Sequence, residues 1–187
     1  MKIISLIFTL FFVSCSMSQA APQASSFSIK SASLEDGVMI PNKHVYNSFG
    51  CTGKNISPQI SWQNAPLETK SFALTVYDPD AKTGSGWWHW LVLNIPKKYS
   101  ELPQNFGEKN QFNLEEGVMQ VRNDFGAFNF GGPCPPIKEK AHRYIFTVYA
   151  LRAERLDLSE GATAALAGFM INQSILVKAS FTAYYGR

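Results

Sequence analysis

The sequence lacks the features of membrane-spanning and nucleic-acid-binding proteins. Beyond its N-terminus, no segment contains the roughly 20 consecutive apolar residues that a transmembrane helix needs. The 17 Lys and Arg residues nearly balance the 14 Asp and Glu residues, the net charge is +3 at pH 7, and the basic residues form no cluster. A small charge without a basic patch argues against nucleic-acid and anionic-membrane partners. We therefore expect no transmembrane segment and no nucleic-acid partner.

Cysteine and histidine are also scarce, with three of each in 187 residues. No Cys-x-x-Cys spacing occurs, and no two histidines stand four residues apart on a predicted helix, so the common metal-binding patterns are missing. We expect no metal and no cofactor. Cys15 lies near the N-terminus, which leaves Cys51 and Cys134 in the body of the chain. In an oxidising compartment these two could form a disulfide, and the sequence does not decide whether they do.

The N-terminal residues have the layout of a bacterial signal peptide. Lys2 precedes an apolar run over residues 3–13, and small and polar residues follow up to position 21. Cleavage at the small residues 18–20 would give a soluble periplasmic or secreted protein. Alternatively, residues 12–15 loosely resemble a lipobox, and the product would be a lipoprotein anchored through Cys15. We assign residues 1–21 to the signal peptide and 22–187 to a single domain.

The domain has the sequence texture of a mainly β protein. It contains no internal repeat, and turn signals separate short runs rich in β-branched and aromatic residues. The predicted strands are 26–31, 59–62, 71–78, 88–95, 143–151 and 179–185. Both faces of the strands over 71–78 and 143–151 carry sizeable side chains, which is typical of central strands in a sandwich.

Two segments depart from this texture. Residues 159–177 are rich in Ala, with apolar residues spaced for one helical face, and they predict a helix that has Ser159 as its N-cap. Residues 96–130 are polar, contain several glycines and show no sustained periodicity. We interpret them as an excursion that contains short strands.

Groups capable of chemistry stand at the ends of predicted strands. Asp78 and Asp80 flank Pro79 directly after a strand, so the turn can aim both carboxylates at one spot. His89 lies among three tryptophans at the start of another strand and should be partly buried. Alone, each has a plainer interpretation, as a turn with its cap and as a core histidine.

Two further segments fit the same pattern. Strand alternation places His142 and Tyr144 on one face, where they can share a pocket or simply be ordinary sheet-face residues. Residues 131–136, Gly-Gly-Pro-Cys-Pro-Pro, predict a rigid loop whose glycine amides can approach a ligand, although a purely structural loop is the alternative. Loops at the end of a β-sandwich are where such groups gather, which favours a binding pocket.

The order of these motifs resembles the phosphatidylethanolamine-binding protein family, and in particular its bacterial Raf-kinase-inhibitor-like branch. Residues 50–53, 55–58, 122–126 and 181–187 add to the resemblance, which spans about residues 26 to 187. It implies an antiparallel Greek-key β-sandwich with a short helix before the C-terminal strand. It also implies an anion pocket formed by Asp78, His89, Gly132, His142 and Tyr144, with Asp80, Pro133 and Pro135 close by.

On this basis we expect an exported, non-catalytic protein that binds a phosphate-containing small molecule or a lipid head group. A carboxylate beside a phosphate is repulsive, so we hypothesise that Asp78 raises the pKa of a histidine, and that His89 or His142 then donates to the anion. Tyr144 and an amide of the 131–132 region would complete the donors. Binding should then weaken as the pH rises.

Three alternatives remain open at this stage. The chain could be a protein-interaction or inhibitor module with a vestigial pocket, whose partner the sequence does not identify, and it could form a homodimer. Asp78, Asp80, His89 and His142 also have the ligand types of a metal-dependent phosphoester hydrolase. Finally, Cys134 could act as a nucleophile beside His142.

Overall fold

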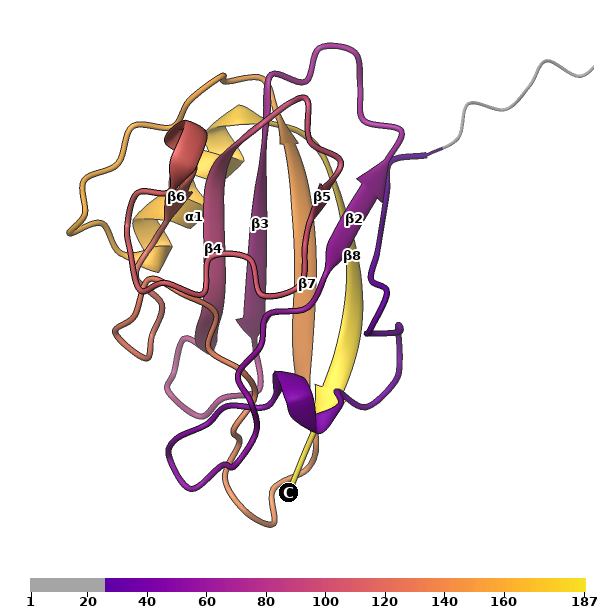
Figure 1. Cartoon of the computed structure of the whole chain (residues 1–187), viewed down its shortest axis with the longest axis vertical. Helices are drawn as coiled ribbons and strands as arrows, with labels where there is room; N and C mark the ends of the chain where they lie inside the picture. The colour runs from indigo at the N-terminus through magenta and orange to yellow at the C-terminus, as the bar shows by residue number, and fades with distance from the viewer. Residues whose placement is uncertain (1–25) are drawn as a thin grey trace, which may run out of the picture.

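The β-strands of the computed structural model, which describes residues 26–187, form two antiparallel sheets (Figure 1). The predicted signal peptide and Cys15 lie outside the described residues. The smaller sheet has the order β1-β2-β5 and consists of Ser28–Lys30, Ile60–Gln63 and Glu101–Leu102. The larger has the order β6-β4-β3-β7-β8 and consists of Met119–Gln120, Trp87–Pro96, Ser71–Asp78, His142–Leu151 and Ile175–Tyr185. This confirms the predicted mainly β fold.

The larger sheet is covered on both faces, which explains the apolar residues on both sides of its central strands. On one face, Phe72, Leu74 and Val148 pack against Ile60 and Trp62 of the smaller sheet. The other face is covered by helix α1 (Ala164–Ser174) and by the segment before it (Figure 1). The apolar side chains between the two sheets form the core of a sandwich, and their burial supplies most of the hydrophobic stabilisation between the sheets.

Helix α1 is shorter than predicted. It begins at Ala164, where the side-chain oxygen of Thr163 accepts a hydrogen bond from the Leu166 amide, so Thr163 and not Ser159 is the N-cap. Residues 159–162 form a separate turn, closed by the Ala162 amide and the Ser159 carbonyl. At the other end the chain passes directly into β8 at Ile175, where β-branched side chains favour a strand.

The excursion over residues 96–130 contains the short strands that we expected. It contributes β5 and β6, one to each sheet, and the 3-10 helix η2 (Glu115–Gly117). A second 3-10 helix, η1 (Asn42–His44), ends in His44, whose imidazole is fully buried. Its two ring nitrogens lie 2.9 Å from the Ser33 hydroxyl and 2.6 Å from the Ile56 carbonyl. His44 is therefore a satisfied core histidine.

A β-bulge in β4 sets which side chains face the sandwich core near the strand ends. Val76 pairs with Trp90, but the next residue of β3, Tyr77, pairs with Trp88, so β4 advances two residues while β3 advances one. An extra residue of this kind reverses the alternation of the strand beyond it. The Trp88 ring accordingly packs beside Tyr77 on the outer face, 4.5 Å between ring centres, while His89 turns toward the core side.

No helix in residues 26–187 is long and apolar enough to cross a membrane.

Candidate functional site

Three strands bring the predicted site residues to one end of the larger sheet. Asp78 is the last residue of β3, His89 stands near the start of β4, and His142 opens β7. Because β3 lies between β4 and β7 and is antiparallel to both, its end meets both of their beginnings. The fold therefore gathers residues that are up to 64 positions apart in the sequence, as in the pair Asp78 and His142.

A cavity of about 270 Å³ lies at this end of the sheet. Its polar lining includes Asp78, His89, His142 and Tyr144, and Pro135 is the member of the predicted proline pair that reaches it. Residues that the sequence argument did not assign to the site also line it: Phe49, Ala81, Lys82, Thr83, Trp87, Phe125, Cys134 and Pro136.

Three polar atoms of this lining are buried without a hydrogen-bond partner among the described residues. They are Trp87 Nε1, His89 Nε2 and Tyr144 Oη, and they make up three of the five such side-chain atoms in that part of the chain. A buried polar atom without a partner costs roughly 1–3 kcal/mol, so native proteins seldom keep several of them together. Their convergence makes this cavity the candidate site for a polar ligand.

Asp78 and His142 form a buried pair beside these atoms. Asp78 Oδ2 lies 2.7 Å from His142 Nδ1, while its Oδ1 accepts hydrogen bonds from the amides of Asp80 and Ala81. Burial lowers the pKa of His142, but its hydrogen bonds to Asp78 and Glu139 outweigh burial and raise that pKa overall. The sequence argument expected Asp78 to act on a histidine in this way, and the histidine is His142.

His89 has the opposite electrostatic character. Its Nδ1 donates to the Gly131 carbonyl at 2.6 Å, which leaves Nε2 as the atom that faces the cavity. Burial lowers the pKa of His89 to about 4, against smaller opposing effects of that hydrogen bond and of the charge on Asp78. At neutral pH, His89 Nε2 is thus an acceptor, and it becomes a donor only when a bound group stabilises the imidazolium.

Tyr144 and Trp87 are the two permanent donors. Burial and the nearby Asp78 charge raise the pKa of Tyr144, so its hydroxyl keeps its proton. The Trp87 indole N–H has no acid–base chemistry at ordinary pH. Sequence reasoning missed Trp87 because simple alternation places it on the opposite side of the strand from Trp90, and only the bulge turns it inward.

An aromatic wall completes the interior. The Phe125 ring stands edge to face with Trp87 and His89, at 5.2 and 5.3 Å between ring centres. Phe125 is held there by its loop, because Asn123 accepts from the amides of Phe125 and Ala127 and donates to the His89 carbonyl. These contacts give the 122–126 motif a structural role, which is to fix one wall of the cavity.

The loop over residues 131–136 forms another wall, but its glycine amides are already used. The Gly131 amide donates to the His89 carbonyl at 2.9 Å, and the Gly132 amide donates to Asn55 Oδ1 at 2.7 Å. Neither is free for a ligand, contrary to our expectation of a loop donor. Gly132 is instead needed for close packing, since a Cβ there would lie 2.1 Å from the His44 carbonyl oxygen.

Two further predicted residues lie outside the lining. Asp80 points away from the cavity into a two-pronged ion pair with Arg143, and that guanidinium lowers the pKa of the Asp80 carboxyl. Pro133 uses its carbonyl to hold the Tyr46 amide. Neither residue is among those that line the cavity, and both support the loops around it.

A disulfide joins Cys51 to Cys134 and thereby restrains the loop over residues 131–136. Arg187 adds to this support by donating to the Pro135 carbonyl at 2.6 Å and to the Gly50 carbonyl at 2.8 Å. The bond consumes the Cys134 thiol, so the nucleophile hypothesis is wrong. The metal hypothesis also loses its ligand set: in residues 26–187, no three His, Cys, Asp or Glu side chains are grouped closely enough to hold a metal ion.

Lys82, which lines the cavity, and His142 both contact Glu139, which is not part of the lining. Glu139 Oε1 lies 2.8 Å from Lys82 Nζ, and its Oε2 lies 3.1 Å from His142 Nε2. Lys82 and then His142 lower the pKa of the Glu139 carboxyl. Both nitrogens of His142 therefore face carboxylates, so His142 is not the free anion donor that the sequence argument allowed.

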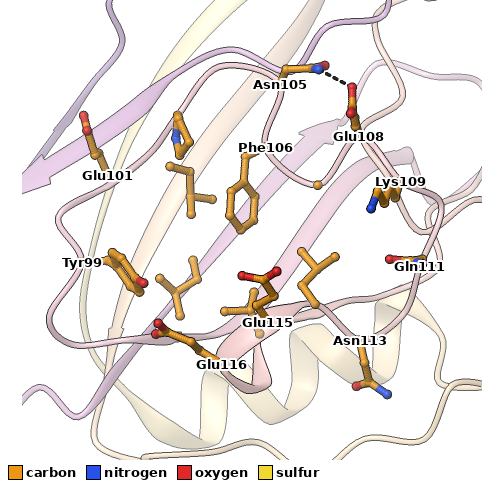
Figure 2. Close-up of a pocket in the computed structure, with 16 residues that line it drawn as sticks. Tyr99, Glu101, Asn105, Phe106, Glu108, Lys109, Gln111, Asn113, Glu115 and Glu116 are labelled. Atoms are coloured by element: carbon orange, nitrogen blue, oxygen red, sulfur yellow. Dashed lines mark hydrogen bonds between the residues drawn. The ribbon is translucent and has the colours of Figure 1, made fainter.

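Another cavity, of about 710 Å³, lies beside β5 and η2 (Figure 2). The residues that line it include Phe106 and several glutamates (Figure 2). Glu108 accepts from Asn105, and Glu116 pairs with Lys98 at 2.8 Å. None of the buried, unpaired side-chain atoms of the described chain lines this cavity. Of these two cavities, the one at His89 is thus the better candidate for a specific polar ligand.

The chain is similar to proteins of one known family. The sequence profile of the phosphatidylethanolamine-binding protein family matches residues 30–186. The chain is 49% identical to the UPF0098 protein YbhB of Escherichia coli over 81% of its length and 95% of that protein. It is 45% identical to the UPF0098 protein YbcL of the same organism, over 87% of this chain and 89% of YbcL.

A solved structure and a more distant relative agree. The crystal structure of E. coli YbcL superimposes with a TM-score of 0.83 at 44% identity, covering 87% of this chain and 99% of that one. A putative lipoprotein of Mycobacterium tuberculosis, LppC, is 34% identical over 82% of this chain and 69% of its own length. This chain therefore belongs to the phosphatidylethanolamine-binding protein family.

Proposed function

We propose that this member of the family binds a phosphate-containing small molecule or a lipid head group in the cavity at His89, and that it does not transform its ligand. The observation that carries the proposal is the convergence of Trp87 Nε1, His89 Nε2 and Tyr144 Oη, each buried and without a partner among the described residues. Three such atoms suit the several oxygens of a tetrahedral anion, since each oxygen can take a separate hydrogen bond.

The acid–base states of these atoms favour an anion that binds together with a proton. Trp87 and Tyr144 donate at any ordinary pH, but His89 Nε2 accepts until it is protonated. A phosphate monoester can bring a proton on one of its own oxygens, while a diester requires His89 to take one from solvent. In both cases a single proton lies between His89 and the phosphate, and it offsets the repulsion from the buried Asp78 carboxylate.

The absence of turnover is proposed because the lining offers no activated nucleophile among the described residues. The Thr83 hydroxyl donates to the Gly86 carbonyl, and the Cys134 sulfur is in the disulfide. Both oxygens of Asp78 are occupied by hydrogen bonds. A base paired with a free hydroxyl or thiol, which nucleophilic catalysis requires, is not formed by these residues.

Export is also part of the proposal. The disulfide between Cys51 and Cys134 supports an oxidising compartment, and the layout of residues 1–21 supports a signal peptide. We propose a periplasmic or secreted protein. Anchoring through Cys15 is the alternative, and the name of the relative LppC as a putative lipoprotein favours it. The mass of the N-terminal peptide of the mature protein distinguishes the two.

Calorimetric titration with inorganic phosphate and with phosphoethanolamine tests the binding proposal. Trp87→Phe and Tyr144→Phe each remove one donor and keep the ring, so each should weaken binding by about tenfold. Trp88→Phe is the matched control, since the Trp88 side chain packs beside Tyr77 on the other face of β4. Equal affinities for wild type and both donor variants would contradict the proposal. Release of phosphate from p-nitrophenyl phosphate that Tyr144→Phe abolishes would contradict the absence of turnover.

A further inference from the structure

We propose that the cavity beside β5 and η2 is a docking site for a partner protein, and that it takes an exposed segment with one apolar side chain between lysines or arginines. This edge cavity, of about 710 Å³, is lined by residues of β5 and by the residue before β6, which are edge strands of the two sheets. It shares no lining residue with the cavity at His89. The inference therefore concerns a second site, beyond the proposed function.

Apolar side chains of the sandwich core line the edge cavity. Ile95 of β4, Leu102 of β5 and Val118 before β6 belong to the core between the sheets and are at most 5% exposed. Phe106 and Leu114 pack against that core and remain half-buried. The Phe106 ring stands among aliphatic side chains of the lining (Figure 2). An apolar side chain that enters the cavity removes these surfaces from water, which is favourable.

The charged residues of the same lining are mostly acidic. They are the glutamates Glu101, Glu108, Glu115 and Glu116, all exposed, and a single basic residue, Lys109. The chain as a whole carries +3, so the lining departs from the overall charge balance. Negative charge gathered around an apolar surface attracts basic partners and repels nucleic acid and anionic membranes.

Most of these carboxylates lack a basic partner within the described chain. Among the ion pairs of residues 26–187, only that of Glu116 with Lys98, at 2.8 Å, involves this lining. Glu101 and Glu108 accept hydrogen bonds from neutral side-chain amides instead. A lysine or arginine of a partner segment would supply the counter-charge that this part of the chain does not provide.

The walls of the edge cavity are fixed by a buried side chain. Gln120 of β6 is fully buried, its amide donates to the Gly107 carbonyl at 3.1 Å, and its oxygen accepts from the Trp90 indole at 2.9 Å. Gly107 has a left-handed φ of 62°, and a Cβ there would lie 2.3 Å from Gln120 Oε1. On the other side, the Leu114 amide donates to the Val118 carbonyl at 2.8 Å. A partner therefore meets a cavity that is already formed, which lowers the entropic cost of binding.

Side chains rather than backbone should carry the recognition. β5 has only two residues, Glu101 and Leu102, and the next residue, Pro103, has no amide hydrogen to donate. Addition of a strand at this edge would gain few backbone hydrogen bonds. The lining instead suits a segment that inserts one apolar side chain as an anchor and places its basic residues beside the glutamates.

The probe is a library of short synthetic peptides in which Lys and Arg flank one apolar residue, varied from Val to Trp. A second library has Glu in place of the basic residues, and a third keeps the basic residues but has Ser at the centre. NMR titration of the isotope-labelled protein measures the affinity and locates the contact. We expect the first library to bind with shift changes at Leu102, Phe106 and Leu114, and the other two to bind at least about tenfold more weakly.

Charge variants of the protein test the complementarity with opposite signs. Glu108→Gln combined with Glu115→Gln should weaken binding of the basic peptides about tenfold, because each exposed charge pair contributes about threefold. Lys109→Gln, which removes the one basic residue of the lining, should strengthen binding about threefold. Glu160→Gln is the matched control, because Glu160 is exposed before α1 and outside the lining. All four positions are exposed, so the variants should fold like wild type.

Four results would overturn the inference. One is that no peptide of the first library binds at concentrations up to about 1 mM, and another is that the double variant binds like the control. Equal affinity for spermidine would assign the cavity to small organic cations. Self-association, measured by sedimentation equilibrium and abolished in the double variant, would assign it to a second copy of this chain. Phosphate binding at His89 should be unchanged in every variant, so this inference and the proposed function fail separately.

Discussion

Raising the pH should weaken the binding of a phosphodiester to this protein steeply, through the single side chain of His89. A diester such as glycerophosphoethanolamine has no proton to share, so His89 Nε2 must be protonated to donate to it. Burial holds the pKa of His89 at about 4 before the ligand binds. The bound phosphate raises that pKa, because a negative charge beside an imidazole stabilises its charged form.

The size of the effect follows from the cost of protonating His89. Each pH unit above the pKa of the ligand-free site costs 1.36 kcal/mol, so protonation at pH 7 costs about 4 kcal/mol and at pH 5 about 1.4 kcal/mol. Affinity should be greatest at low pH and fall tenfold per pH unit while the pKa of the bound state exceeds the working pH. Between pH 5 and 7 the loss is about 100-fold.

Isothermal titration calorimetry at several pH values, in buffers of different ionisation enthalpy, measures both the affinity and the number of protons taken up. We expect close to one proton per ligand at pH 6. His89→Gln should bind weakly and take up no proton over this range, while the raised pKa of His142 confines its own contribution to higher pH. An affinity that stays constant from pH 5 to 7, without proton uptake, would refute the role given to His89.

Three other outcomes are expected. Loss of the disulfide in Cys51→Ser should lower the free energy of unfolding in urea by about 4 kcal/mol, because the bond closes a loop of 83 residues; a change below 1 kcal/mol would show that the loop is restrained in other ways. Gly132→Ala should be strongly destabilised by its clash with the His44 carbonyl, seen as a lower melting temperature, whereas exposed Gly161→Ala should melt like wild type. The raised pKa of His142 stabilises the fold fully below pH 6.5, and this contribution is lost as the pH rises through that pKa. The melting temperature of His142→Gln should therefore lack this fall, and an equal fall in wild type and variant would contradict the assignment.

The strands were predictable because their signals are local. The run over residues 71–78 coincides with β3, and the alternation in 143–151 marked β7 to within one residue. The start of α1 was not predictable, since both Ser159 and Thr163 can cap a helix. Thr163 is the N-cap because the chain first forms a separate turn over residues 159–162, and the helix begins only after it.

The candidate site divides in the same way. Asp78, His89, His142 and Tyr144 stood out in the sequence because polar groups at strand ends are unusual next to apolar runs, and the structure places all four around one cavity. Glu139 and Lys82 carried no signal, because charged residues in a polar loop look like ordinary solvated surface. The structure joins them in an ion pair between residues 57 positions apart.

The sequence by itself determined the mainly β fold and the chemical groups available at one end of the sheet, since side-chain type and strand alternation are properties of neighbouring residues. Tertiary structure alone decided how those groups are used. The bulge between Trp88 and Trp90 turns Trp87 and His89 inward, and the packing around Gly131 and Gly132 consumes the amides that we expected to be free. Both depend on the register between strands and on contacts between distant loops, which no local pattern encodes.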